Sequence, residues 1–217
     1  MTNMTTQQIM RAMEGLCDTL EREKDYLSEL DGAIGDGDHG VNMAKCFREV
    51  RKRLSESGGQ DVGTVLKNVG MVVLNSVGGA MGALYGTLFL RMAPEAKEKT
   101  AIDLRDLARM FKAAEKGVLE IGKASLGDKT LVDTLTPAVG ALEKAEQEGK
   151  SFPEALSAFE AAARKGMEST RDLVAKIGRA SRLGERTRGH QDAGATSCYF
   201  IIRAFSEGLK VPGSLSK

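Results

Sequence analysis

Four glycine-rich polar stretches divide this chain of 217 residues, and segments with helical periodicity lie between them. The stretches cover residues 31–40, 76–82, 122–130 and 176–194. They follow the first, third, fifth and seventh of the eight helices that the spacing of apolar residues predicts. Every second connection of an up-down helix bundle lies at the same end. The sequence therefore predicts a single all-α domain over residues 1–217, an eight-helix up-down bundle or barrel with all four stretches at one rim.

The predicted helices are bounded by capping residues, glycines and prolines. The first is expected to run without interruption from Thr5 or Thr6 to about Leu30, and the sixth is expected to begin with Asp128 or Thr130 as its cap. The segment 195–205 is β-branched and aromatic, but a single strand would have no partner, so we expect a buried helix. The other helices are expected from about His39, from Asp61 to Asn75, from the 76–82 stretch to Met92, from Leu104 to Ile121, and from Pro153.

The stretch from residue 31 to residue 40 carries three carboxylates, those of Asp31, Asp36 and Asp38, together with four glycines. Two carboxylates about 5 Å apart repel by about 3 kcal/mol at an effective dielectric constant of about 20. Such a cluster is therefore either fully solvated or neutralised by a cation. Glycine lets the backbone approach a ligand closely, and hard carboxylate oxygens suit Mg²⁺. A magnesium site is the favoured interpretation, and an acidic surface turn with Asp38 as a helix cap is the alternative.

Three familiar nucleotide and metal motifs do not fit the chain. Residues 35–40 match the dinucleotide-binding pattern G-x-G-x-x-G, but no buried strand precedes them, and the aspartates would repel a pyrophosphate without a metal. An EF-hand loop counted from Asp36 lacks the required glycine and glutamate. The stretch 122–130 nearly spells a P-loop, but Asp128 is inserted before the lysine and no strand comes before it.

Residues 176–194 are expected to form the longest loop, without secondary structure, and this loop is basic and rich in glycine. Loops of this length are usually functional or disordered. Arginine guanidinium groups match phosphate oxygens in geometry, although a solvated basic loop is the alternative. At a shared rim, magnesium ligands, glycine backbone and arginines would converge, and such a set describes a nucleotide polyphosphate site.

Composition narrows the range of partners. The formal net charge is +1, aromatic residues make up 5% and tryptophan is absent, so neither nucleic acid nor an acidic membrane surface is expected. No apolar run is long enough for membrane insertion, and no signal-peptide pattern is present. The three cysteines are scattered and odd in number, as expected for free thiols in a reducing compartment. We therefore expect a cytoplasmic protein.

Five motifs occur in order along the chain, and together they resemble one family. They are Asp-x-x-Ile-Gly-Asp-x-Asp-His-Gly, Ser-Val-Gly-Gly-Ala, Gly-Asp-Lys-Thr, Gly-Arg-Ala-Ser-x-Leu-Gly-Glu-Arg and Gly-His-Gln-Asp-x-Gly-Ala-Thr-Ser. The set looks like the nucleotide-binding L subunit of dihydroxyacetone kinase and covers residues 5–206. The resemblance implies an eight-helix barrel that holds ADP or ATP at one rim through two Mg²⁺ ions.

The resemblance also implies roles for individual residues, although it assigns no catalytic residue. By this resemblance the metal ligands are Asp31, Asp36 and Asp38. Leu131 is expected to face the adenine. The positions that match the family's nucleotide contacts are His39, Gly40, Val41, Asn42, Gly79, Ala80, Met81, Gly122, Leu131, Arg179, Asp192, Ala193 and Gly194.

The chain departs from the family in the second stretch. The family usually reads Gly-Gly-Ala-Ser-Gly-Pro-Leu, and this chain reads Gly-Gly-Ala-Met-Gly-Ala-Leu over residues 78–84. Met81 thus replaces a serine whose hydroxyl can bond a phosphate, while the backbone N–H groups are kept. One neutral hydrogen bond contributes about 0.5–1.5 kcal/mol, which corresponds to a weakening of nucleotide binding by up to about tenfold.

The two histidines, His39 and His190, both lie in the nucleotide motifs. In the family, the ketose binds covalently to a histidine of a separate K subunit, and this chain has no further histidine for that role. We therefore expect a kinase subunit that presents the phosphoryl group and is inactive without its K-type, ketose-binding partner. The phosphoryl donor is either a phosphotransferase-system protein, with ADP as a bound cofactor, or ATP itself, as in erythrulose-type kinases.

Other functions and assemblies stay open at this point. One is a non-catalytic nucleotide- or lipid-binding regulatory module, with lipid in an apolar barrel interior. Another is a stand-alone Mg²⁺-dependent hydrolase in which His39 is the base that activates water. A homodimer is also open, and the sequence does not choose among ketose substrates.

Overall fold

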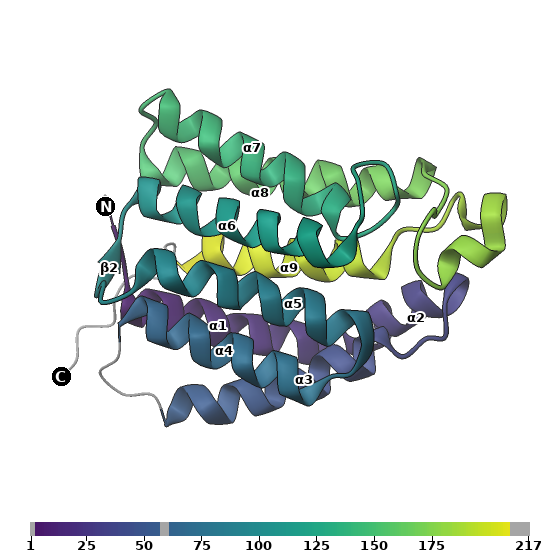
Figure 1. Cartoon of the computed structure of the whole chain (residues 1–217), viewed down its shortest axis with the longest axis horizontal. Coiled ribbons are helices and arrows are strands. Elements are labelled where there is room, and N and C mark those ends of the chain that lie inside the picture. The colour runs from purple at the N-terminus through teal and green to yellow at the C-terminus, as the bar shows by residue number, and fades with distance from the viewer. Residues whose placement is uncertain (1–2, 57–60, 209–217) are drawn as a thin grey trace.

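The computed structural model describes residues 3–56 and 61–208, and most of these residues are helical (Figure 1). The all-α prediction is confirmed. The helices are α1 (Thr6–Arg22), α2 (Lys24–Ile34), α3 (His39–Ser55), α4 (Val62–Ser76), α5 (Gly79–Met92), α6 (Leu104–Gly122), α7 (Val132–Gln147), α8 (Phe152–Ser169) and α9 (Ala193–Gly208). Short 3₁₀ helices are η1 (Ala93–Ala96), η2 (Thr170–Asp172) and η3 (Ala180–Thr187). Within the described ranges, no helix combines the length and the apolar character needed to cross a membrane.

The helices pack in chain order around a closed ring. α1 packs against α3, each later helix packs against the next one through to α9, and α9 returns to α1. In Figure 1, α9 (yellow) runs through the middle of the view, and it contacts both α8 and α1. α2 lies beyond the end of α1, where it packs against α3 and α9.

Phenylalanine side chains pair with one another inside the mostly aliphatic core of this ring. Phe111 of α6 meets Phe159 of α8 and Phe205 of α9, with ring centroids 4.6 and 5.1 Å apart. Phe47 of α3 meets Phe89 of α5 at 6.4 Å. Edge-to-face pairs of this kind contribute about 0.5–1.5 kcal/mol each beyond the apolar area that they bury. The ring therefore surrounds a packed core.

Several predicted helix boundaries are confirmed. α3 begins at His39. Asp61 caps α4 by accepting a hydrogen bond from the Thr64 N–H at 3.1 Å. α6 begins at Leu104, and the β-branched segment near the end of the chain is the buried helix α9. Apolar spacing together with a capping residue thus reveals the start of a helix such as α4 in the sequence.

The first predicted helix is wrong as one continuous element. The chain forms α1 and α2, which meet at Glu23, so the described residues contain nine α-helices rather than eight. At Glu23 the backbone leaves the helical region, with φ −91° and ψ 9°. The polar run 21–25 offers no apolar residue whose spacing could reveal this change of direction. α2 extends through Ile34, and Asp31 therefore lies in a helix rather than in a loop.

The long 176–194 loop was wrongly predicted to lack secondary structure, because η3 occupies its centre. Two side chains stabilise this 3₁₀ helix locally. The hydroxyl of Ser181 donates to the Gly178 carbonyl at 2.7 Å, and the hydroxyl of Thr187 donates to the Gly184 carbonyl at 2.8 Å. Such side-chain bonds to the backbone compete with open loop conformations, and apolar periodicity does not report them.

The predicted cap of the sixth helix is correct for one of its two candidates. α7 begins at Val132, and Oγ1 of Thr130 accepts the Val132 N–H at 3.2 Å, whereas the carboxylate of Asp128 accepts the Ser125 N–H instead. Asp133, in the first turn of α7, bonds to the loop before the helix. Its carboxylate accepts the N–H groups of Gly127 and Thr130 at 2.5 and 2.7 Å. Asp133 is buried, and these two hydrogen bonds from its carboxylate hold the loop that precedes α7.

A small antiparallel pair of strands was not predicted. β1 (Met4–Thr5) pairs with β2 (Ala101–Ile102), and each strand has two residues. Two residues are too few for the alternation that identifies a strand in a sequence. The pair joins the start of α1 to the start of α6, away from α2 (Figure 1).

Candidate functional site

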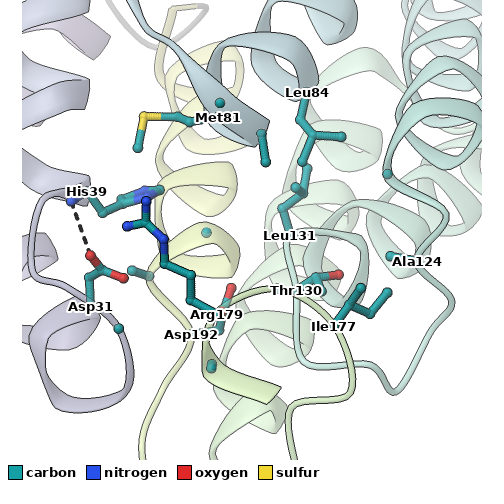
Figure 2. Close-up of a pocket in the computed structure, with 18 of the residues that line it drawn as sticks. Asp31, His39, Met81, Leu84, Ala124, Thr130, Leu131, Ile177, Arg179 and Asp192 are labelled. Atoms are coloured by element: carbon teal, nitrogen blue, oxygen red, sulfur yellow. Dashed lines mark hydrogen bonds between the residues drawn. The ribbon is translucent and has the colours of Figure 1, made fainter. Parts of the chain in front are cut away.

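A cavity of about 480 Å³ lies at the end of the bundle where α2 is found (Figure 2). Residues from all four glycine-rich stretches line it, which confirms that these stretches share one end. Every residue of the predicted metal and nucleotide sets lines the cavity except Gly40 and Val41. The up-down order of the helices therefore brings together residues that lie more than 150 positions apart, such as Asp31 and Asp192.

Four helices begin at this cavity, and each contributes its first turn or its cap to the wall. They are α3 with His39 and Asn42, α5 with Gly79 to Met81, α7 with Leu131 and Val132, and α9 with Ala193 and Gly194. Helices that run in the same direction begin at the same end of the bundle. The N-terminus of a helix carries free N–H groups and a partial positive charge. The cavity is therefore suited to an anion such as phosphate.

Three carboxylates meet at one side of the cavity. Oxygen atoms of Asp31, Asp36 and Asp38 all lie within 4.8 Å of one another. The guanidinium group of Arg179 contacts the carboxylate of Asp36, and Figure 2 shows the Arg179 side chain extending toward Asp31 and His39. Three hard oxygen ligands at this separation suit a divalent cation such as Mg²⁺, which shares its shell with water and phosphate.

Two glycines allow the close packing around these carboxylates. A β-carbon at Gly35 would lie 2.4 Å from a carboxylate oxygen of Asp31, and one at Gly40 would lie 1.9 Å from the Lys24 carbonyl oxygen. Gly40 therefore lets the start of α3 cross closely over α2, and this packing explains the glycine. Val41 is 49% exposed. A nucleotide contact by either Gly40 or Val41 stays a prediction.

A chain of hydrogen bonds ties α3, α5 and α9 together beside the cavity. Nε2 of His39 lies 2.8 Å from Oγ of Ser197, and this Oγ lies 2.6 Å from the hydroxyl oxygen of Tyr85. Tyr85 also donates to the Gly194 carbonyl at 2.8 Å. Neither Tyr85 nor Ser197 was predicted as a site residue, although Ser197 ends the fifth motif. The motif was the signal that could have identified Ser197.

His39 is neutral at pH 7 in this environment. Burial lowers the pKa of His39 to about 4, and the nearby Asp38 opposes this effect only in part. The backbone N–H of His39 donates to the Asp31 carboxylate at 3.3 Å (Figure 2), so this residue also orients one of the three carboxylates. A weakly basic imidazole that is bonded to Ser197 is poorly suited to activate water. This finding disfavours the hydrolase alternative.

The opposite side of the cavity is mostly apolar, with Thr130 as a polar member (Figure 2). Figure 2 shows Leu84, Leu131 and Ile177 on this side, and Ala124 lies close by. Of these four residues, only Leu131 was predicted. Val118 and Ile121 of α6 also line the cavity, and Ile121 is 48% exposed. The position of Ile121 directly before a glycine-rich stretch is the sequence signal that could have identified the apolar side of the cavity.

Asp192 supports the start of α9. Its carboxylate accepts the Ala195 N–H at 2.7 Å, and its own N–H donates to Oγ1 of Thr170 at 3.1 Å. Burial raises the pKa of Asp192 to about 6, although the Ala195 N–H and the ammonium of Lys129 lower it. The folded protein therefore holds this carboxylate at a cost in stability above pH 6.

We expect Asp192→Asn to stabilise the protein at pH 8 and to lose this advantage in acid. Asparagine keeps an oxygen that can accept the Ala195 N–H. The carboxyl has a pKa near 3.8 when unfolded and about 6 when folded, so its destabilising effect is complete above pH 6 and vanishes below about pH 4. The shift corresponds to about 3 kcal/mol. Urea unfolding at pH 8 and pH 4 measures the difference, and equal stability of variant and wild type at pH 8 would contradict this prediction.

The chain belongs to the DAK2 domain family, whose model matches residues 33–207. It is 40% identical over 208 residues to the ADP-binding subunit DhaL of the PEP-dependent dihydroxyacetone kinase of Escherichia coli (strain K12), with coverage of 96% of this chain and 99% of that subunit. The resemblance to the L subunit of dihydroxyacetone kinase is therefore confirmed.

Longer kinases contain a similar region. The chain is 32% identical to the D-erythrulose kinase of Mycolicibacterium smegmatis, with coverage of 92% of this chain and 35% of that enzyme. A crystal structure of the dihydroxyacetone kinase from C. freundii in complex with AMP-PNP and Mg²⁺ is similar with a TM-score of 0.67 at 25% identity, over 91% of this chain and 33% of that one. The chain thus spans about a third of these two kinases.

Proposed function

We propose that this chain is the ADP- or ATP- and Mg²⁺-binding subunit of a kinase for dihydroxyacetone or a related ketose. The observation that carries the proposal is the two-sided cavity. One side has three clustered carboxylates, the other side is mostly apolar, and four helices begin at the cavity. A magnesium nucleotide has the same two-sided character. The E. coli relative is named as an ADP-binding subunit, and the C. freundii relative was solved with AMP-PNP and Mg²⁺.

Asp31, Asp36 and Asp38 would hold the magnesium, and the family resemblance suggests two ions. Bound magnesium supplies the positive charge that neutralises phosphate oxygens. The three carboxylates require such a charge, because without it they would repel phosphate as well as one another. Arg179 lies beside Asp36, where its guanidinium group can add donors for phosphate oxygens.

Backbone N–H groups at the start of α5 would bind phosphate. Gly79 has φ +69°, a left-handed conformation that glycine adopts readily, and Ala80 and Met81 follow it in the cavity wall. Met81 offers no hydroxyl, so the backbone must carry these contacts. Leu131 would lie against the adenine. The remaining proposed nucleotide contacts are His39, Gly40, Val41, Asn42, Gly122, Arg179, Asp192, Ala193 and Gly194.

A separate K-type subunit would hold the ketose. Both histidines of the chain lie in the motifs at the nucleotide end of the bundle, and His39 is committed to Ser197. The subunit would therefore contribute a positioned phosphoryl group, and the partner would contribute the acceptor. We favour a phosphotransferase-system donor over direct use of ATP. The E. coli relative is named as part of a PEP-dependent kinase, and the alignment covers nearly the whole of both chains.

The other functions have less support. The packed core of the ring, with Phe111 between Phe159 and Phe205, argues against a lipid chamber. An erythrulose-type kinase subunit is the second candidate, since the D-erythrulose kinase shares 32% identity over 92% of this chain. A cytoplasmic location follows from the proposed role in ketose metabolism.

Binding of the magnesium nucleotide is tested by thermal unfolding. The midpoint is measured with ADP, with Mg²⁺ and with both. At a hundredfold excess over Kd, a ligand stabilises a protein by about 2.7 kcal/mol, which raises the midpoint by roughly 5–10 °C in a chain of this size. We expect this shift only when both are present. Equal shifts for ADP with and without Mg²⁺ would argue against a metal-dependent site.

A further inference from the structure

Lys129 is a buried lysine in the Gly127 to Thr130 stretch, which resembles a P-loop only superficially. Its side chain is 2% exposed. Its ammonium group donates to two backbone carbonyl oxygens, those of Thr170 and His190. Both acceptors are backbone atoms of the protein itself. The proposed binding of magnesium and nucleotide assigns no role to this lysine.

Two features of Lys129 are energetically unfavourable in the folded protein: its backbone conformation and the burial of its ammonium group. Lys129 adopts φ +62°, a conformation that L-residues other than glycine, asparagine and aspartate rarely adopt. A buried ammonium group is also unfavourable unless hydrogen bonds compensate for the lost water. Glycine would relieve the backbone but would lose the ammonium group. A residue that is held in an unfavourable conformation points to a specific requirement for its side chain.

The two carbonyls that Lys129 binds belong to segments that adjoin its own loop. A β-carbon at Gly194 would lie 3.7 Å from the backbone nitrogen of Leu131, so the 129–131 loop and the 191–194 segment form neighbouring parts of the cavity wall. Lys129, Thr130 and Leu131 line one wall. His190 directly precedes the segment 191–194, whose last three residues line another wall. Thr170 holds the same segment a second time, because its Oγ1 accepts the Asp192 N–H at 3.1 Å. The lysine therefore links two walls of the cavity through contacts that are 41 and 61 residues apart in sequence.

We propose that Lys129 is a positioning residue that fixes the distance between the 129–131 wall and the 191–194 wall of the nucleotide cavity. This inference rests on the proposed function in one respect, namely that the ligand is a nucleotide. Leu131 and Gly194 stand on the two walls that it joins. The start of α7 is also joined to the start of α9 by the hydroxyl of Thr134, which donates to the Ala195 carbonyl at 3.0 Å, and Lys129 adds two hydrogen bonds on the loop side of that contact.

The test compares Lys129→Met with wild type. Methionine keeps most of the side-chain volume and loses both hydrogen bonds. Lys123→Met is the matched control, because Lys123 lies in the same loop region with φ +53° but has an exposed side chain that does not line the cavity. Amide hydrogen exchange is measured without nucleotide, and the Kd for ADP with Mg²⁺ is measured at a temperature where every variant is folded.

We expect Lys129→Met to speed exchange at least tenfold at the amides of Gly189, Asp192 and Ala195, and to raise the Kd at least tenfold. Amides in the interior of α4 and α5 should keep their wild-type protection. Lys129→Gln, which keeps one donor group, should give an intermediate Kd and also serves if the methionine variant does not fold. The Lys123→Met control should match wild type in both measurements.

A lower thermal midpoint with unchanged Kd and unchanged local exchange would overturn the proposal, because the lysine would then act only on global stability. Absence of ADP binding by the wild-type protein would count against the proposed function instead. In that case the exchange data, which need no nucleotide, still decide whether Lys129 holds the 191–194 wall.

Discussion

Asp36→Asn is expected to abolish the joint stabilisation by ADP and Mg²⁺, so that the midpoint with both ligands equals the midpoint with neither. Asp36 is one of three carboxylates whose oxygens lie within 4.8 Å of one another. Removing one hard, charged ligand weakens a magnesium site strongly, and the nucleotide depends on that magnesium. The lost shift would be roughly 5–10 °C under saturating conditions.

The same variant should change the stability of the ligand-free protein only slightly. Asparagine removes repulsion from Asp31 and Asp38, and it also removes the contact with Arg179. The two effects oppose each other, and an exposed ion pair contributes about 1 kcal/mol or less. Asp25→Asn is the matched control, since Asp25 lies in α2 with a side chain that is 96% exposed. A full joint shift in Asp36→Asn would show that the carboxylate cluster does not carry the metal.

The purified chain alone is expected to phosphorylate neither dihydroxyacetone nor a related ketose. Phosphoryl transfer depends mainly on holding the acceptor in line with the phosphate, and good positioning corresponds to effective molarities of about 10⁵ M or more. The polar groups of the cavity match a nucleotide and its metal, and the acceptor would gain no such positioning from them. Turnover should appear only when a K-type subunit is added.

A coupled assay with the purified chain and then with a titrated partner measures this dependence. We expect activity to saturate with the partner and charge reversal at Arg186 to weaken docking more than nucleotide binding. Arg186 is the better choice than Arg188, because Arg188 donates to Asp172 and pairs with Glu185 within its own loop. Sustained ketose phosphorylation by the chain without any partner would instead establish a self-sufficient kinase.

The sequence predicts those parts of the fold that depend on local signals. Caps and amphipathic repeats locate α3, α4 and α6, the lack of a partner strand identifies α9 as a helix, and the alternation of helices with glycine-rich stretches places those stretches at one end. The break at Glu23 and the 3₁₀ helix η3 were missed for a different reason. Both depend on backbone geometry in polar segments, where apolar spacing carries no information.

The residues of the candidate site also fall into two groups, those that the sequence could predict and those that it could not. The carboxylates and glycines form dense local motifs, and they could be predicted. Tyr85 and Lys129 could not be assigned roles, because each acts through contacts that only the folded chain creates. Lys129 bonds to residues 41 and 61 positions away, and Tyr85 bonds to a residue 109 positions away. A single sequence contains no signal for such pairs.

The closed ring also determines when the protein becomes able to bind its ligand. The cavity takes one wall from α2 and another from α9, and α9 is the last helix of the described chain. Contacts of large sequence separation form late in folding, because closing a long loop costs entropy before any contact compensates for it. During synthesis the early helices can pack first, while the ligand end stays incomplete until α9 docks between α1 and α8. Ligand binding would then stabilise only molecules in which α9 has docked. In the cell, finished subunits would therefore be more stable than truncated or misassembled ones.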